Sequence, residues 1–166
     1  LGDVPLSFVL NSVDSEPQKK VFQNVVAQIQ ENLPGVTVQL ETKPRQTYFT
    51  TLFEFKTPAA YSGWGADFAD PISFFAMFES DSGLNFPQYN NPAYDAAIAK
   101  AESAEMGQNP EKRWETFFEA ERILLNDFVA IPVYQKGAKI ITQNGIQNFT
   151  YKTGQPVRHF RLVTQK

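Results

Sequence analysis

The segment SGWGADFADPISFF, residues 62–75, places a large aromatic ring close to a carboxylate. Trp64 stands between two glycines, which leave the backbone around the ring open to approach. Asp70 and Pro71 suit the N-cap and the first turn of a helix, so capping does not require Asp67. A buried or half-buried carboxylate without a local partner requires a cation, because an unpaired buried charge is costly. The segment therefore predicts that Asp67 receives a cation beside the ring of Trp64.

The same acids could instead form a catalytic pair. Asp67 and Asp70 could serve a carboxylate-pair hydrolase, but glycoside hydrolysis needs a defined separation across the substrate. Two acids three residues apart at a helix start are more often a cap and its neighbour. A Ser-His-Asp triad would require His159, and no serine stands in a GxSxG turn. The sequence favours binding over catalysis, and the hydrolase remains the alternative from another class.

Other classes of site lack the residues that they need. The chain has no cysteine and a single histidine, so we expect no metal or cofactor, and a structural role is the simplest one for His159. There is neither a GxGxxG motif nor a Walker loop to bind phosphate. The net charge of −3 and the lack of a Lys/Arg cluster disfavour nucleic-acid binding. No apolar run is long enough to span a membrane.

The length and the first residues bear on domain organisation. At 166 residues, with 42% hydrophobic and 20% charged residues, the chain suits one globular domain with a well-buried core. It begins Leu1-Gly2-Asp3, with neither an initiator methionine nor a signal peptide. We therefore expect it to be a piece of a larger protein.

The first forty residues predict a β-α-β unit. Leu6, Phe8 and Leu10 alternate with polar or small neighbours, as in a short strand. Ser15 and Gln18 have the spacing of a capping box, and apolar residues then recur at helical spacing until Pro34-Gly35. A second alternating stretch covers residues 36–40. Two parallel strands with a helix packed across them are the natural arrangement.

Three later helices open with the same device, an Asp or Asn followed by proline. They are predicted from Asp70-Pro71 to residue 78, from Asn91-Pro92, and from Asn109-Pro110. The helical spacing of their aromatic residues predicts core packing for Phe74, Phe75, Phe78, Trp114, Phe117 and Phe118. Residues 128–134 (FVAIPVY) predict a buried strand with proline at an edge or a bulge. Beyond Gly137 two strands, 138–142 and 157–163, are predicted without any further helix.

Four ordered blocks of the chain resemble one known family. GWGADFADP (residues 63–71) is similar to the GW-x-AD-(Y/F)-x-(D/E)-P motif of the family 5 extracellular solute-binding proteins, the peptide-binding receptors of ABC importers. SFFAMFESDSG (73–83), NNPAYDAAIAKA (90–101) and RWETFFEAERILLNDFVAIPVY (113–134) resemble its following segments. The resemblance covers nearly the whole chain but only the C-terminal part of the family's much longer members.

The resemblance implies a fold and a division into domains. Family members have the type II periplasmic-binding-protein fold, in which two α/β lobes close over a ligand. By this analogy residues 1–136 are most of the C-terminal ligand-binding lobe. Residues 137–166 would be a returning β segment that packs on an N-terminal lobe missing from this chain.

The resemblance also implies a function. In the oligopeptide-binding members the motif's aspartate pairs with the ligand's α-ammonium group, a role that falls on Asp67, with Trp64, Gly65 and Ala66 as the lining. Gly65 replaces a bulkier residue of some members and could widen the pocket. The implied protein is not an enzyme and works outside the cytoplasm, in the periplasm or on the cell surface. It would deliver oligopeptides to an ABC permease, and an absent N-terminus could carry a lipid anchor. Receptors for a signalling peptide, a sugar or a metal complex remain alternatives.

Overall fold

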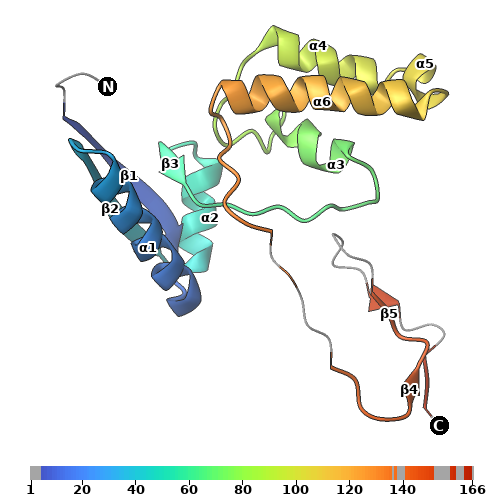
Figure 1. The fold of residues 1–166 in the computed structure, drawn as a ribbon, viewed down its shortest axis with the longest axis horizontal. Helices are drawn as coiled ribbons and strands as arrows, with labels where there is room; N and C mark the ends of the chain where they lie inside the picture. The colour runs from blue at the N-terminus through green and yellow to red at the C-terminus, as the bar shows by residue number, and fades with distance from the viewer. Residues whose placement is uncertain (1–4, 136, 138–140, 152–157, 160–162, 166) are drawn as a thin grey trace. The chain divides into compact units, whose positions relative to one another are not determined.

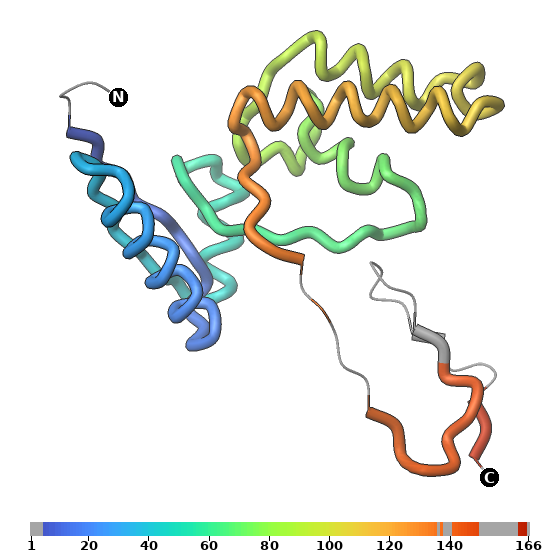
Figure 2. The backbone as a smooth tube through the Cα atoms, in the orientation of Figure 1, coloured from blue at the N-terminus to red at the C-terminus, as the bar shows by residue number. Residues whose placement is uncertain are grey.

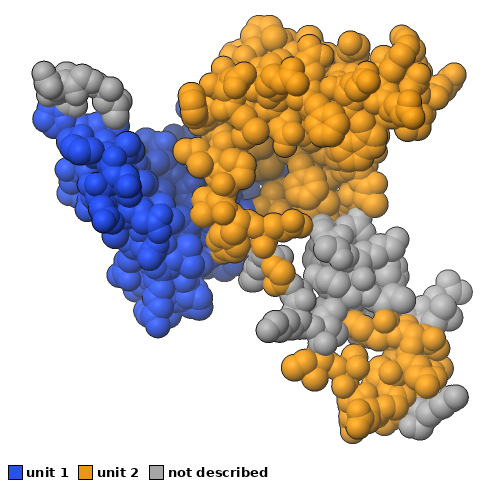
Figure 3. All heavy atoms as spheres, in the orientation of Figure 1, with its two compact units in different colours: residues 1–63, 83–88 blue, residues 64–82, 89–166 orange. Residues whose placement is uncertain are grey.

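The computed structural model (Figure 1) describes residues 5–135, 137, 141–151, 158–159 and 163–165. Strands and helices alternate up to residue 60, helices follow up to residue 126, and short strands come last. Figure 2 traces the course of the backbone from the N-terminus to the C-terminus by colour. Contacts between residues divide the chain into two compact units (Figure 3): residues 1–63 with 83–88, and residues 64–82 with 89–166. We call these unit 1 and unit 2. The candidate residues Trp64 and Asp67 belong to unit 2.

Unit 1 is built on a small parallel sheet. Strand β1 (Leu6–Val13) pairs along its whole length with β2 (Val36–Lys43), and its other edge pairs with β3 (Ala59–Ala60). Helix α1 (Glu16–Asn32) connects β1 to β2, and α2 (Arg45–Phe53) follows β2. The predicted β-α-β unit with parallel strands is therefore confirmed.

The two ends of α1 agree with the sequence prediction in part. Ser15 is the N-cap in an extended conformation, but its side chain makes no capping hydrogen bond, so the capping-box contact was wrong. The proline that follows it still lies in the first turn. At the other end Gly35 has φ of +86°, a left-handed conformation that glycine adopts without a steric cost. The predicted helix stop at Pro34-Gly35 is confirmed.

Aromatic residues close the core of unit 1. Phe22 of α1 is buried, and its ring centroid lies 4.3 Å from that of Tyr61. The buried Tyr48 of α2 donates its hydroxyl hydrogen bond to the backbone carbonyl of Tyr61. The chain that follows β3 is thus tied to both helices of this unit.

Unit 2 is a helical unit in which α4 (Pro92–Ala101) and α6 (Pro110–Asn126) lie side by side and run in opposite directions (Figure 1). The single-turn helix α5 (Ala104–Gly107) joins them. Helix α3 (Ile72–Phe75) continues as the 3-10 turn η1 (Ala76–Phe78), as the sequence predicted for residues 72–78.

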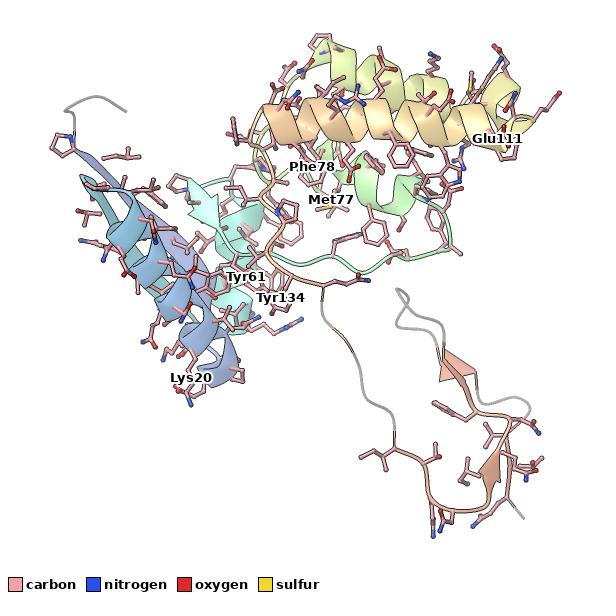
Figure 4. The ribbon with its side chains drawn as sticks, viewed as in Figure 1. Lys20, Tyr61, Met77, Phe78, Glu111 and Tyr134 are labelled. Atoms are coloured by element: carbon pink, nitrogen blue, oxygen red, sulfur yellow. The ribbon has the colours of Figure 1, made fainter. Side chains whose placement is uncertain are left out.

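Asparagine caps start both long helices of unit 2. The Asn91 side chain accepts hydrogen bonds from the N–H groups of Ala93 and Tyr94, and the Asn109 side chain accepts one from that of Lys112. The two predicted Asn-Pro helix starts are confirmed. The core between these helices consists of Ile72, Tyr94, Ala97, Ile98, Ala101, Phe117, Ala120 and Leu124. Residues of α3 and η1, among them Phe78, pack against it (Figure 4).

Three aromatic residues predicted to be core are exposed. Trp114 is 52% exposed, Phe118 is 56% exposed and Phe74 is 43% exposed, so this prediction was wrong for them. Trp114 and Phe118 lie together on one side of the buried stripe of α6, with ring centroids 6.1 Å apart. Helical spacing predicted which side of α6 is apolar, but the packed stripe is narrower than the apolar face.

The stretch 128–134 is not a strand, contrary to the prediction. Phe128 has φ of +55° at the end of α6, and it is 79% exposed. Extended residues form a strand only when a neighbouring strand pairs with them, and no described strand pairs with this stretch. Only Val129 and Ala130 pack against the core of unit 2.

The described part of the C-terminal segment contains two short antiparallel pairs. β4 (Ile146–Gln147) pairs with β7 (Thr164–Gln165), and β5 (Thr150–Tyr151) pairs with β6 (Arg158–His159). β6 lies within the predicted strand 157–163. Residue 163, which the structure also describes, is not in a strand. Residues 141 and 142 are not in a strand, and the rest of the predicted strand 138–142 lies outside the described residues. The domain boundary between 136 and 137 remains a prediction. No helix in the described part of the chain is both long and apolar enough to cross a bilayer.

Candidate ligand-binding site

The first turn of α3 holds the segment 64–67 in place. The indole Nε1–H of Trp64 donates a hydrogen bond of 2.7 Å to the backbone carbonyl of Ser73. The backbone N–H of Asp67 donates one of 2.8 Å to the Ser73 hydroxyl oxygen. Ser73 is buried. One buried residue therefore fixes both the ring of Trp64 and the backbone from which the Asp67 side chain projects.

Asp70 holds the first turn of α3 by accepting hydrogen bonds from its backbone N–H groups. Its carboxylate accepts a hydrogen bond of 3.0 Å from the N–H of Ile72, and its carbonyl accepts one of 3.1 Å from the N–H of Ser73. The predicted helix start after Asp70-Pro71 is confirmed, but Pro71 and not Asp70 stands at the N-cap, so the capping role predicted for Asp70 was wrong by one residue.

Arg113 of α6 anchors Asp70. Its Nη1 lies 2.6 Å from Oδ2 of Asp70 and its Nη2 lies 2.9 Å from Oδ1, which is a bidentate pair. Its Nε–H donates a bond of 2.9 Å to the carbonyl of Ala101 at the end of α4, and its guanidinium lies 4.9 Å from the ring centroid of Phe117. The hydrogen bond from Arg113 holds the pKa of the Asp70 carboxyl below its usual value. Asp70 therefore stays ionised and paired at neutral pH.

The candidate residues differ in what they present to solvent. Trp64 is 36% exposed, and Asp67 and Gly65 are exposed, whereas Ala66 is buried. The sequence suggested a buried or half-buried carboxylate at Asp67, and in this chain the carboxylate is open to solvent. A Cβ built on Gly65 would meet no atom within 4 Å, so the backbone here is open to a ligand. Ala66 therefore presents little of its surface to a ligand.

The two acids of the motif have different surroundings, and these decide between the two chemistries. The Asp70 carboxylate is occupied by Arg113 and the α3 backbone. The carboxylate of Asp67 bonds to none of the residues that the structure describes. A hydrolase needs a general acid with a raised pKa, whereas the pKa of Asp70 is lowered. The pair is therefore poorly suited to acid–base catalysis, and Asp67 alone is available to a cation.

Metal binding has no support in the described residues, where no group of three or more His, Cys, Asp or Glu side chains could hold an ion. The strand β6 contains His159.

Sequence reasoning missed two residues of this site, Ser73 and Arg113. Ser73 gave no signal, because its contacts depend on the loop turning back over α3. Arg113 did give one, since a cation near the N-terminus of α6 opposes the helix dipole and suggests a specific carboxylate partner.

Comparisons with known proteins find relatives of this chain that are peptide-binding proteins. No protein-family model matches it. The periplasmic oligopeptide-binding protein OppA of Salmonella typhimurium is 34% identical over 133 residues, which cover 80% of this chain and 24% of OppA. The periplasmic murein peptide-binding protein MppA of Escherichia coli is 30% identical over 132 residues, which cover 79% of this chain and 24% of MppA. The chain thus spans about a quarter of the length of these curated relatives.

Solved structures of similar proteins share the fold. The peptide-binding pheromone receptor PrgZ matches 96% of this chain and 30% of its own, with a TM-score of 0.80 and 30% identity. Haemophilus influenzae OppA in complex with RPPGFSPFR matches 75% of this chain and 24% of its own, with a TM-score of 0.70 and 31% identity. The predicted α/β architecture is confirmed. Over 80% of its length this chain is thus similar to peptide-binding members of the family 5 extracellular solute-binding proteins.

Proposed function

We propose that this chain is the C-terminal part of the substrate-binding component of an ABC importer, which captures oligopeptides outside the membrane and delivers them to a permease. The observation that carries the proposal is the exposed Asp67 carboxylate, whose backbone is bonded to the same residue, Ser73, as the indole of Trp64, in a chain related to oligopeptide-binding proteins. The structures of H. influenzae OppA with RPPGFSPFR and of peptide-bound Listeria monocytogenes OppA support a peptide as the ligand.

Asp67 would pair with the α-ammonium group of the peptide. A carboxylate fixed through its backbone forms a strong charge-assisted hydrogen bond with such a group, and the bond strengthens when lobe closure removes water. Trp64, Gly65 and Ala66 would line the adjacent part of the cleft. The ring covers an apolar side chain without selecting it, and the open backbone at Gly65 can pair with the peptide main chain.

The proposed protein binds and releases its ligand without catalysing a reaction. The relatives named above are binding proteins, and the Asp70–Arg113 pair argues against a carboxylate-pair hydrolase. Residues 1–136 would form most of the C-terminal lobe, and residues 137–166 would return to the N-terminal lobe. The protein would act in the periplasm or on the cell surface, with a lipid anchor as one means of attachment.

A signalling peptide is a second candidate ligand, favoured by the likeness to the pheromone receptor PrgZ. The two candidates differ in ligand diversity: a nutrient importer accepts many sequences, and a signalling receptor selects one.

The test replaces Asp67 by asparagine in the full-length protein that contains this chain. Binding of tri-, tetra- and penta-alanine is measured by titration calorimetry, each with a free and with an acetylated N-terminus. Losing one charge-assisted bond weakens binding of the free-amine peptides by about 10- to 100-fold. Binding of the acetylated peptides stays within about twofold, since they carry no ammonium group. Equal losses for both peptide forms, or no loss for either, would refute the role of Asp67.

A further inference from the structure

The geometry points to Ser73 as the positioning residue of this site. We propose that Ser73 sets where the Asp67 carboxylate meets the ligand's ammonium group and how the ring of Trp64 is oriented. This inference rests on the proposed function of Asp67. It gives Ser73 a part in the preference for a free amine that is exerted through Asp67.

The Ser73 hydroxyl acts on Asp67. Its oxygen accepts the Asp67 backbone N–H at 2.8 Å, so the backbone that carries the exposed carboxylate has a buried support. Without the hydroxyl, the Asp67 N–H would have to find water or another acceptor, and the backbone would shift. A misplaced carboxylate loses most of a charged hydrogen bond, because such bonds depend strongly on distance and angle.

The Ser73 carbonyl acts on Trp64. The indole N–H, the only hydrogen-bond donor of this side chain, already donates to it at 2.7 Å. Trp64 therefore offers a ligand the face of its ring and no donor. This arrangement suits an apolar or varied side chain, and it leaves Asp67 as the charged contact of the segment.

Ser73 can act as a support because Asp70 and Arg113 fix its turn. The Ser73 N–H donates to the Asp70 carbonyl at 3.1 Å, and Arg113 holds the Asp70 carboxylate through two bonds. Arg113 in turn bonds the carbonyl of Ala101 at the end of α4. The segment 64–67 is thus linked through α3 to both long helices of unit 2.

The test measures a ratio in the full-length protein: the affinity for the free-amine alanine peptide divided by that for its acetylated form. Ser73→Ala removes the hydroxyl but keeps the carbonyl that holds Trp64. We expect the ratio to fall by about tenfold, while binding of the acetylated peptide changes by less than about twofold. Ser80→Ala is the matched control. It removes another serine hydroxyl of unit 2, which donates a hydrogen bond of 2.6 Å to the Asp95 carboxylate and none to residues 64–67. This variant should leave the ratio unchanged.

Two further variants separate the possible outcomes. In an Asp67→Asn background Ser73→Ala should have no added effect on the ratio, because the carboxylate that it positions is gone. Arg113→Lys keeps the positive charge but loses the bidentate pairing of the guanidinium with Asp70, and it should lower the ratio by about threefold. This variant tests the proposal even if Ser73→Ala does not fold. If Asp67→Asn lowers the ratio but neither Ser73→Ala nor Arg113→Lys does, the positioning role is refuted and the proposed function stands. If Asp67→Asn leaves the ratio unchanged, the proposed role of Asp67, on which this inference rests, fails.

Discussion

Replacing Arg113 by alanine should loosen the part of unit 2 that holds the candidate site. The change removes the bidentate pair with Asp70, the bond from Nε to the Ala101 carbonyl and the contact with the Phe117 ring. It also leaves the Asp70 carboxylate without its cation.

The size of the effect follows from the surroundings of the pair. Exposed ion pairs contribute about 0–1 kcal/mol, and breaking a buried pair costs about 3–5 kcal/mol. The side chains of Arg113 and Asp70 are 24% and 29% exposed, so the bidentate pair lies between these cases, at about 1–3 kcal/mol. The bond to Ala101 contributes about 1 kcal/mol. The contact with Phe117 contributes about 0.5–1 kcal/mol. We expect a loss of about 3 kcal/mol for Arg113→Ala and of about 1–2 kcal/mol for Arg113→Lys.

The assay is hydrogen–deuterium exchange of the full-length protein, read by mass spectrometry in peptides covering residues 64–78 and 110–126. If the free energy of local opening falls by about 3 kcal/mol, the amides of both peptides should exchange about a hundredfold faster through local opening. Peptides from α1, in unit 1, are the internal control and should exchange as in the wild type. Unchanged exchange at residues 64–78 would show that Arg113 does not hold this segment, and it would refute the chain of contacts from α6 to Trp64.

Three further predictions follow from the same structure. Phe117→Ala in the 166-residue chain should lower the free energy of unfolding by about 3–5 kcal/mol in urea titrations, because Phe117 is buried, whereas Phe118→Ala should cost less than about 1 kcal/mol. Tyr94→Phe removes the bond of 2.7 Å from a fully buried hydroxyl to the Phe75 carbonyl, and the same titrations should show a loss of about 1–2 kcal/mol; an unchanged midpoint would refute it. Because Arg113 lowers the folded-state pKa of Asp70 from 3.8, the stabilisation from this carboxylate is complete above about pH 5 and is lost as the pH falls through the folded-state pKa. The stability difference between wild type and Asp70→Asn should therefore shrink between about pH 5 and pH 2, and a difference that grows on acidification would contradict this sign.

The local features of the chain were predictable from sequence. The Asp-Pro and Asn-Pro pairs predicted three helix starts, because a capping side chain and a proline act on the backbone next to them. Alternating apolar residues predicted the parallel pair of β1 and β2. Asp70 supports the start of α3 as a neighbour of the cap, because Pro71 itself stands at the N-cap.

Contacts between distant residues were not predictable. Arg113 pairs with Asp70 across 43 positions of the chain, and nothing in the local spacing joins them. Phe117 and Phe118 have equal hydrophobicity, yet one is 1% exposed and the other 56%, because the partner surface decides which flank of α6 is covered. The apolar stretch 128–134 has the composition of a strand, but no described strand pairs with it.

The most direct test of the central claim is mass spectrometry of the full-length protein as purified, first native and then denatured. We predict that denaturation releases short peptides of mixed sequence with free N-termini. One dominant peptide would favour a signalling receptor over a nutrient importer. A released sugar or metal complex, or a protein that carries no ligand and binds none of the alanine peptides, would contradict the assignment of a peptide to the Trp64 and Asp67 site.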